Sequence, residues 1–180
     1  MELKIVKSLG ILNKVKNILN KEVLRILYFM MIQPYLTYCN IVWGEASQLV
    51  LNGLKCLQKR AVHLITHSQY RAPTSPIFKD ICVLKIEDLH SLHLALFVYK
   101  VQNNLVPQSC LRHISFAVNP HQYLLRRENE FCIASFRTNV REKYIGVCGP
   151  KYWNSLPEFI KEPVYSIDAF KRRLVCFLNG

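Results

Sequence analysis

The sequence predicts a mainly α-helical protein with one shared hydrophobic core. Three observations favour this class. Apolar residues recur at helical spacing over several long segments. Residues that commonly cap helices stand directly before several of these segments. The chain has 180 residues, of which 51% are hydrophobic and 20% charged, as is ordinary for a soluble globular domain.

The first helix is expected over residues 2–19, where apolar side chains alternate with lysines at near-helical spacing and Gly10 lies inside the pattern. Asn20 can cap a second helix from about residue 21 to 32. Glu22 then suits the positive end of that helix.

A break follows the second helix. Pro34 cannot continue a helix cleanly, and it disfavours the α conformation at Gln33. The next residues include Tyr35, Leu36, Tyr38 and Trp43, and we expect them to fold back onto the core. Rings beside a helix break usually pack, although a direct role in stacking on nucleic-acid bases is the alternative.

Three more helices are expected in the middle of the chain. Ser47 is a good N-cap for a helix over residues 48–66. Ser75 and the proline after it predict the start of a short helix over residues 77–81. Residues 85–104 carry acids early and a lysine late, and they are apolar on more than one face. This segment is therefore expected to be the central buried helix.

The C-terminal part is expected to be rich in loops. Residues 115–148 are short apolar pieces without a dominant period, and one or two short strands are expected there. Gly149 and Pro150 predict the start of a short helix. Ser166 can cap a last helix over residues 167–178.

The chain is strongly basic, with 24 Lys and Arg against 12 Asp and Glu and a net charge of +12. A balance of this kind favours a polyanionic partner, most often nucleic acid. The longest uncharged apolar run, residues 26–32, is too short to cross a bilayer, so no membrane association is expected.

The seven cysteines indicate a compartment for the protein. Their number is odd, no CxxC pair occurs, and most have apolar neighbours. This pattern predicts reduced, buried thiols in an intracellular protein, in the cytoplasm or the nucleus.

No catalytic centre is expected from these residues. The three aspartates, Asp80, Asp88 and Asp168, lie too far apart in sequence to form a paired metal-binding motif, and there is no glycine-rich phosphate loop. Cys110, His113, His121 and Cys132 fit no known zinc spacing. We therefore assign no catalytic residue, no metal and no cofactor.

Basic side chains are the best candidates for binding. Four of them share one helical arc: Lys55, Lys59, Arg60 and His63. With its apolar side anchored, such a helix can lie along a phosphate backbone. Five more stand near aromatic residues in the loop-rich part: Arg126, Arg127, Arg137, Arg141 and Lys143. Cations among aromatic rings suit single-stranded nucleic acid. For both groups, the alternative is a solvated surface that only keeps the chain soluble.

Four stretches carry a resemblance to a known family. They are "KSLGILNKVKNIL", "LYFMMIQPYLTYCNIVWG", "LQKRAVHLITHSQYRAPTSPIFKDICVLKIEDLHSLHLALFVYKVQNNLVP" and "GPKYWNSLPEFIK". In order, and over nearly the whole chain, they resemble the region after the polymerase core in reverse transcriptases of non-LTR retrotransposons. The resemblance is to the Jockey-like and related long interspersed elements.

The resemblance implies that residues 1–70 form the helical thumb, which closes over the primer–template duplex. Residues 71–180 would be a C-terminal segment packed on it, with a single shared core. The catalytic aspartates of this family lie upstream in the palm, and the palm and fingers are missing here. The expected function is therefore that of a fragment of an RNA-directed DNA polymerase, inactive alone, with residual sequence-independent binding of RNA, DNA or hybrid duplex. The rival expectation is a degenerate or domesticated remnant that binds protein as a scaffold module.

Overall fold

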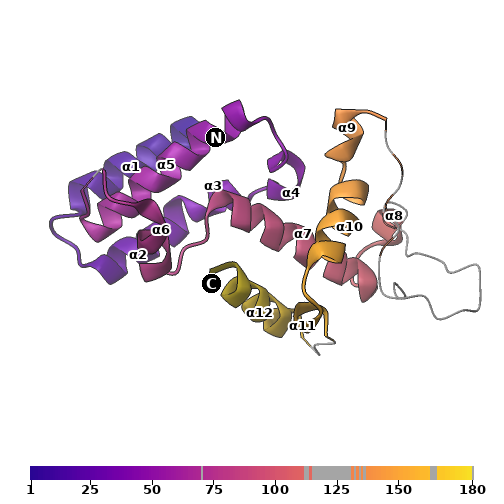
Figure 1. Ribbon diagram of the computed structural model, residues 1–180. Helices are drawn as coiled ribbons and strands as arrows, with labels where there is room; N and C mark the ends of the chain where they lie inside the picture. Colours follow the sequence, from indigo (N-terminus) through magenta and orange to yellow (C-terminus); the bar gives the residue numbers. More distant parts are fainter. Residues whose placement is uncertain are drawn as a thin grey trace, which may run out of the picture. The chain divides into compact units, whose positions relative to one another are not determined.

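The computed structural model describes residues 1–69, 71–111, 114, 131, 133, 135, 137–162 and 166–179, without the side chains of residues 110 and 111. These residues are mainly helical, as the sequence predicted (Figure 1). The chain divides into two compact units, residues 1–90 and 91–178. The boundary that the resemblance implied, at residue 70, lies inside the first unit.

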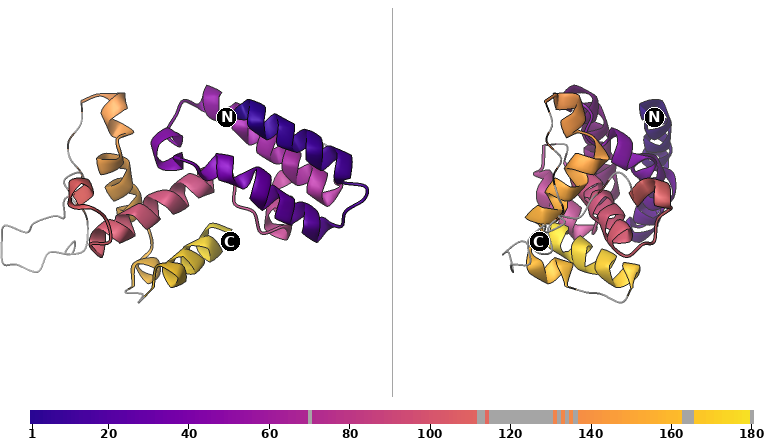
Figure 2. Two further views of the ribbon diagram at one scale, coloured as in Figure 1. Left: turned by 180° about the vertical axis from the view of Figure 1, so that it is seen from behind. Right: turned by 90° about the vertical axis from the view of Figure 1, so that its right-hand side faces the viewer.

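The first unit is built from six helices and the start of a seventh: α1 (Glu2–Val15), α2 (Lys21–Met31), α3 (Gln33–Thr37), α4 (Asn40–Trp43), α5 (Gln48–Thr66), α6 (Thr74–Asp80) and α7 (Ile86–Gln102). The long helix α5 packs against α1, α2 and α6. Figures 1 and 2 show α1 and α5 side by side. α5 is therefore the element around which this unit is organised.

The core of the first unit comes from the apolar stripes that the sequence indicated. α1 buries Ile5, Leu9 and Leu12 between its exposed lysines. α2 buries Leu24 and Tyr28, which are one turn apart. Each stripe repeats every three or four residues, so one side of each helix meets the core while the other meets solvent.

The first helices lie close to the bounds that the sequence predicted. α2 begins after Asn20, whose side chain accepts a hydrogen bond from the Val23 amide at 2.9 Å. α5 follows Ser47 as expected, although the serine side chain makes no capping bond. α1 ends at Val15, four residues before the expected end at residue 19.

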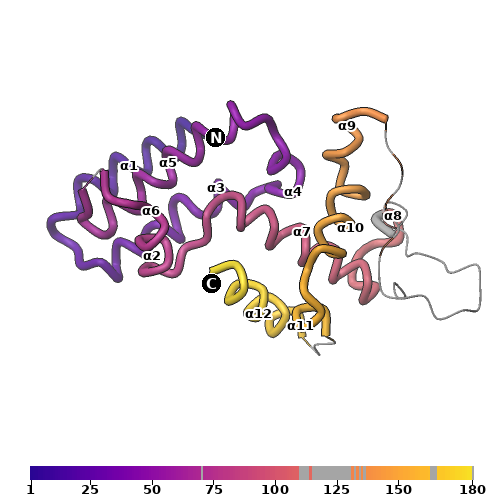
Figure 3. The backbone as a smooth tube through the Cα atoms, in the orientation of Figure 1, coloured from indigo at the N-terminus to yellow at the C-terminus, as the bar shows by residue number. Residues whose placement is uncertain are grey.

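The break after α2 is shorter than the sequence predicted. Pro34 lies in the first turn of α3, and Gln33 is helical, so the expectation that Gln33 leaves the α region was wrong. A proline is tolerated here because the first-turn amides have no helical acceptor. Figure 3 follows the backbone through the short turns that join α2, α3 and α4. Leu36 is buried, but Tyr38 is 72% exposed and does not fold back onto the core.

The turn after α3 is held by a buried polar network. Asn40 donates to the Leu36 carbonyl at 3.0 Å, and its side-chain oxygen lies 3.1 Å from Nδ1 of His90. Nε2 of His90 lies 3.1 Å from the Glu45 carboxylate. A Cβ atom on Gly44 would lie 2.0 Å from His90 Nδ1, so only glycine lets the backbone approach the ring.

α6 begins earlier than expected. It starts at Thr74, with Pro73 before it, and Ser75 and Pro76 both lie in its first turn. The sequence had placed Ser75 outside the helix as its cap. Phe78 points to the core and is 4% exposed, which anchors this short helix against α5.

In its described residues, the second unit contains the rest of α7 and five helices: α8 (Gln108–Leu111), α9 (Asn139–Glu142), α10 (Ile145–Ser155), α11 (Glu158–Lys161) and α12 (Ile167–Asn179). α10 begins four residues before the expected start, and Pro150 lies inside it. Gly149 lies against α7, since a Cβ atom there would be 3.2 Å from Val98. Most of the expected loop-rich region, residues 115–148, falls outside the described residues.

Aromatic side chains form the centre of the second unit. Tyr99 of α7 stacks on Phe170 of α12, with ring centres 4.4 Å apart. Trp153 of α10 stacks on the same phenylalanine, at 5.8 Å. The expectation that α7 is largely buried is confirmed, since most of its apolar residues are buried. The Ser166 hydroxyl accepts from the Ala169 amide at 3.3 Å and caps α12, as predicted.

The prediction that the cysteines are buried was wrong for the residues described. Cys39, Cys56, Cys82 and Cys176 are exposed, and Cys148 is half-buried; all five are free thiols. Apolar sequence neighbours misled here because a helix turns successive residues to different sides. Among the described residues, no helix is long and apolar enough to cross a membrane.

Candidate nucleic-acid interface

The candidate interface is centred on α5, whose sequence separates apolar and basic residues. Its buried side includes Leu54, Ala61 and Ile65, which recur at helical spacing. Lys59 and Arg60 lie on the exposed side. α1 and α6 both pack against this helix, so the exposed arc borders both of them.

Gln58 fixes the segment that follows α6 against α5. Its amide donates to the Tyr28 hydroxyl at 3.0 Å and to the Leu84 carbonyl at 2.9 Å. Its side-chain oxygen accepts from the Ile86 amide at 3.0 Å. Gln58 is only 2% exposed, and these bonds satisfy the polar atoms of a side chain that would otherwise be costly to bury. Burial raises the pKa of Tyr28, which therefore stays neutral.

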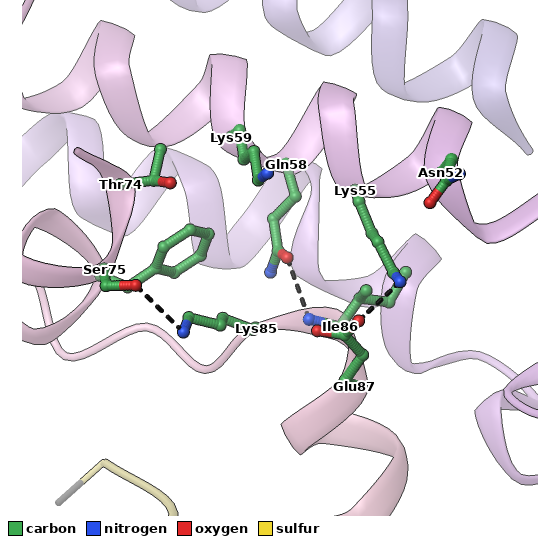
Figure 4. A pocket seen from close by; sticks show the side chains of 10 residues that line it. Asn52, Lys55, Gln58, Lys59, Thr74, Ser75, Lys85, Ile86 and Glu87 are labelled. Carbon is green, nitrogen blue, oxygen red and sulfur yellow. Dashed lines mark hydrogen bonds and ion pairs between the residues drawn. The ribbon is translucent and has the colours of Figure 1, made fainter. Parts of the chain in front are cut away.

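This anchor creates a pocket between α5 and α6. The α5–α6 pocket has a volume of about 370 Å³. Figure 4 shows how Lys55 and Lys59 reach it from α5, while Lys85 reaches it from the segment after α6. Among the described residues, the lining comprises Asn52, Lys55, Gln58, Lys59, Thr74, Ser75, Phe78, Lys85, Ile86 and Glu87. Three ammonium groups, two hydroxyls and one carboxylate thus meet in one place.

Two of the lysines already have partners inside the pocket. Lys55 forms an ion pair with Glu87 at 2.5 Å and donates to the Gln48 side chain at 2.9 Å. Its side chain is only 18% exposed. Lys85 donates to the Ser75 hydroxyl at 3.3 Å. The expected exposure of Lys55 on an open helical face is therefore only partly correct.

Lys59 and Arg60 are available. Both are exposed, and neither pairs with an acidic side chain among the residues that the structure describes. They are neighbours in sequence but line different hollows, since side chains one residue apart diverge by about 100° on a helix. Arg60 belongs to a second pocket, between α1 and α5.

The α1–α5 pocket has a volume of about 290 Å³ and is also basic. Its lining residues are Lys16, Asn17, Arg60, His63, Leu64, His67 and Ser68. His63 is only 9% exposed, and Nδ1 lies 2.8 Å from the Ser68 hydroxyl. His67 has a φ of 52°, so the chain turns back there and brings Ser68 over the helix end. The expected exposure of His63 was therefore wrong.

The remaining predicted residues are not gathered in the same unit. Arg126 and Arg127 lie outside the described residues. Arg137, Arg141 and Lys143 are exposed in the second unit, on and beside α9. Two aromatic residues near them behave differently, since Tyr144 is 42% exposed whereas Phe131 is buried against Trp153. Phe131 is thus not available for stacking on bases.

Sequence reasoning missed several residues that line the two pockets. Lys85, Thr74 and Ser75 border the first, and Lys16 borders the second. Lys16 directly follows the end of α1 and Lys85 directly precedes the start of α7, so no helical periodicity groups them with α5. The one signal in the sequence was Gln58, which shares the apolar side of α5 with Leu54 and Ala61. An amide on that side needs hydrogen-bond partners, and a neighbouring segment can supply them.

The four cysteines and histidines whose spacing fits no zinc site, namely the Cys110 side chain, His113, His121 and Cys132, lie outside the described residues. Within the described part of the chain, no three His, Cys, Asp or Glu side chains are grouped to hold a metal ion. In comparisons with protein-family models, curated proteins and solved structures, nothing matched this chain significantly.

Proposed function

We propose that the chain binds nucleic acid without sequence preference, through the phosphate backbone, and that α5 makes the principal contact. The carrying observation is the pair Lys59 and Arg60, two exposed neighbouring cations with no ion-pair partner among the described residues. Phosphate groups attract such cations, and binding releases the counterions that surround the nucleic acid. A duplex, whether RNA, DNA or hybrid, supplies these groups at regular spacing.

The surroundings of this pair support the proposal. Lys16 and His67 border Arg60, and Lys85 borders the pocket that Lys59 lines. Basic groups therefore continue to both sides of the helix. A rigid helix with its apolar side packed against α1, α2 and α6 can hold these cations in place while a backbone lies across them.

The parentage that best fits this role is the one that the resemblance implies. We propose that the chain derives from the thumb and following segment of a non-LTR retrotransposon reverse transcriptase, an RNA-directed DNA polymerase. It would act inside the cell, in the cytoplasm or the nucleus. The ordered similarity of the four quoted stretches supports this proposal, as does the strongly basic charge. A reading frame directly upstream that encodes a paired-aspartate palm would test it, and an unrelated upstream frame would contradict it.

A double substitution tests the binding function. Lys59→Ala with Arg60→Ala should weaken binding to a labelled DNA duplex and lower the log–log salt slope by about 1.8, which is about 0.9 for each lost phosphate contact. The matched control is Lys7→Ala with Lys14→Ala, which removes the same charge from exposed positions of α1. Equal slopes for the two double variants would refute a specific role for α5.

A second function is favoured by one observation. α2 exposes four apolar side chains on its outer side, namely Val23, Ile26, Phe29 and Met30, with exposed fractions between 37% and 68%. Such a stripe suits a protein partner, as the scaffold reading expects. Chromatography separates the two functions, because late, salt-sensitive elution from heparin supports nucleic-acid binding. Association at high salt that Ile26→Asp abolishes would support the protein partner.

A further inference from the structure

We propose that the α5–α6 pocket is a phosphate-binding subsite, in which a phosphate group takes the place of the Glu87 carboxylate beside Lys55. The inference rests on the proposed function for the source of the phosphate, a nucleic-acid backbone. It places one phosphate contact of that function in the α5–α6 pocket, and it assigns Glu87 a role that opposes binding.

The chemistry of the lining suits a phosphate group. Lys55, Lys59 and Lys85 supply three cations, and the hydroxyls of Thr74 and Ser75 can donate hydrogen bonds. Among the described residues that line the pocket, Glu87 alone carries a carboxylate. A volume of about 370 Å³ lies in the range of small-ligand sites, so a phosphate with its attached sugar can enter.

The two partners of the ion pair differ in how firmly they are held. The Lys55 side chain is 18% exposed and keeps a second bond, to Gln48, at 2.9 Å. The Glu87 side chain is 58% exposed, so it can turn into solvent at little cost. A phosphate offers more negative charge and more acceptor atoms than the carboxylate, and ion pairs with an exposed partner are weak. The carboxylate is therefore the group that leaves.

The frame of the pocket does not depend on this exchange. Gln58 holds the Leu84–Ile86 backbone through two hydrogen bonds and forms a third with the Tyr28 hydroxyl, and Phe78 of α6 is buried. Neither residue needs to move when Glu87 leaves. A backbone frame that is already in place loses little entropy when a ligand binds.

The decisive comparison is between two variants of equal charge. Glu87→Gln removes the competitor from the pocket, whereas Asp80→Asn removes a carboxylate that pairs with Lys21 elsewhere in the same unit. Glu87→Gln should tighten binding of the full chain to a DNA duplex about two- to five-fold at an unchanged salt slope, which corresponds to release of a weak ion pair. Asp80→Asn should change the affinity less. Equal tightening by both variants would refute the phosphate-binding subsite, because it would show only a general effect of the lost negative charge.

A variant that removes a phosphate contact should weaken binding instead of tightening it. Lys85→Ala should lower the salt slope by about 0.9, and Lys7→Ala on the outer side of α1 should leave it unchanged. Thermal unfolding of each variant checks that the chain still folds. A Lys85→Ala slope equal to that of Lys7→Ala, in a chain that folds normally, would also overturn the subsite.

Inorganic phosphate separates this proposal from the broader one. Titration of the full chain should shift the amide NMR signals of Thr74, Ser75 and Lys85, and Glu87→Gln should lower the concentration needed. If phosphate shifts these signals but the duplex does not bind, the subsite stands and nucleic acid is not its source. If the duplex binds through Lys59 and Arg60 while phosphate leaves these signals unchanged, the interface stands and the subsite falls.

Discussion

Replacing Gln58 by methionine tests how the candidate site is built. Methionine has nearly the same length and shape as glutamine but cannot form its hydrogen bonds. The change leaves three polar groups without their partner: the Tyr28 hydroxyl, the Leu84 carbonyl and the Ile86 amide. Tyr28 is fully buried, so water cannot easily replace the lost bond to its hydroxyl.

The expected loss of stability is large. Each buried group left unsatisfied costs about 1–3 kcal/mol, and partial relaxation keeps the sum at roughly 3–5 kcal/mol. A domain of this size has a total unfolding free energy of about 5–15 kcal/mol, so the variant should be clearly destabilised. Gln69→Met, at an exposed position in the loop before α6, is the matched control and should change stability by less than about 0.5 kcal/mol.

Two assays follow the effect. Urea unfolding gives the change in free energy for the whole chain, and hydrogen exchange reports the Ile86 amide directly, because that amide donates to Gln58. Gln58→Met should lower the urea midpoint and speed exchange at Ile86. A loss below about 1 kcal/mol, with unchanged exchange at Ile86, would refute the claim that Gln58 holds the pocket together.

Three further outcomes are expected. Gly44→Ala should destabilise the chain by about 1–3 kcal/mol, because the new Cβ atom would clash with the His90 ring. Gly10→Ala should stabilise α1 by about 0.5–1 kcal/mol, because no atom lies within 4 Å of the new Cβ atom. Urea unfolding of both variants checks these changes in stability. The raised pKa of Tyr28 means that the folded state keeps a proton that the unfolded state loses. Stability should therefore fall as the pH rises above about 10, and a pH series of unfolding on Tyr28→Phe should show a weaker fall; an unchanged fall would contradict the assignment. Asn154→Ala should speed amide exchange at Phe131, whose backbone amide and carbonyl both bond to the Asn154 side chain at 3.0 Å; unchanged exchange would show that these bonds are dispensable.

The fold class and most helix positions could be predicted because they depend on local rules. α5 has the bounds that periodicity indicated, and Asn20 and Ser166 make the capping bonds expected of them. Errors arose at prolines, because a proline is compatible with more than one position relative to a helix. Pro34 was assigned to a break and Pro150 to a helix start, yet Pro34 opens α3 and Pro150 lies within α10.

The candidate site was only partly predictable, since it depends on contacts between segments far apart in sequence. The helical arc of α5 located Lys59 and Arg60 correctly on the exposed side. It could not show that Glu87 reaches Lys55, or that the turn at His67 brings Ser68 against the helix end. These facts depend on how α6, α7 and the loops return to α5, and a helical pattern carries no information about that.

Protection of individual lysines by a bound duplex tests whether α5 contacts the phosphate backbone. The full chain is acetylated at limiting reagent with and without a DNA duplex at low salt, and each site is quantified by mass spectrometry. We expect strong protection of Lys59 and Lys85, with little change at Lys7 on the outer side of α1. Equal reactivity of Lys59 in both samples, while the duplex is demonstrably bound, would contradict the assignment of α5 as the contact with the phosphate backbone.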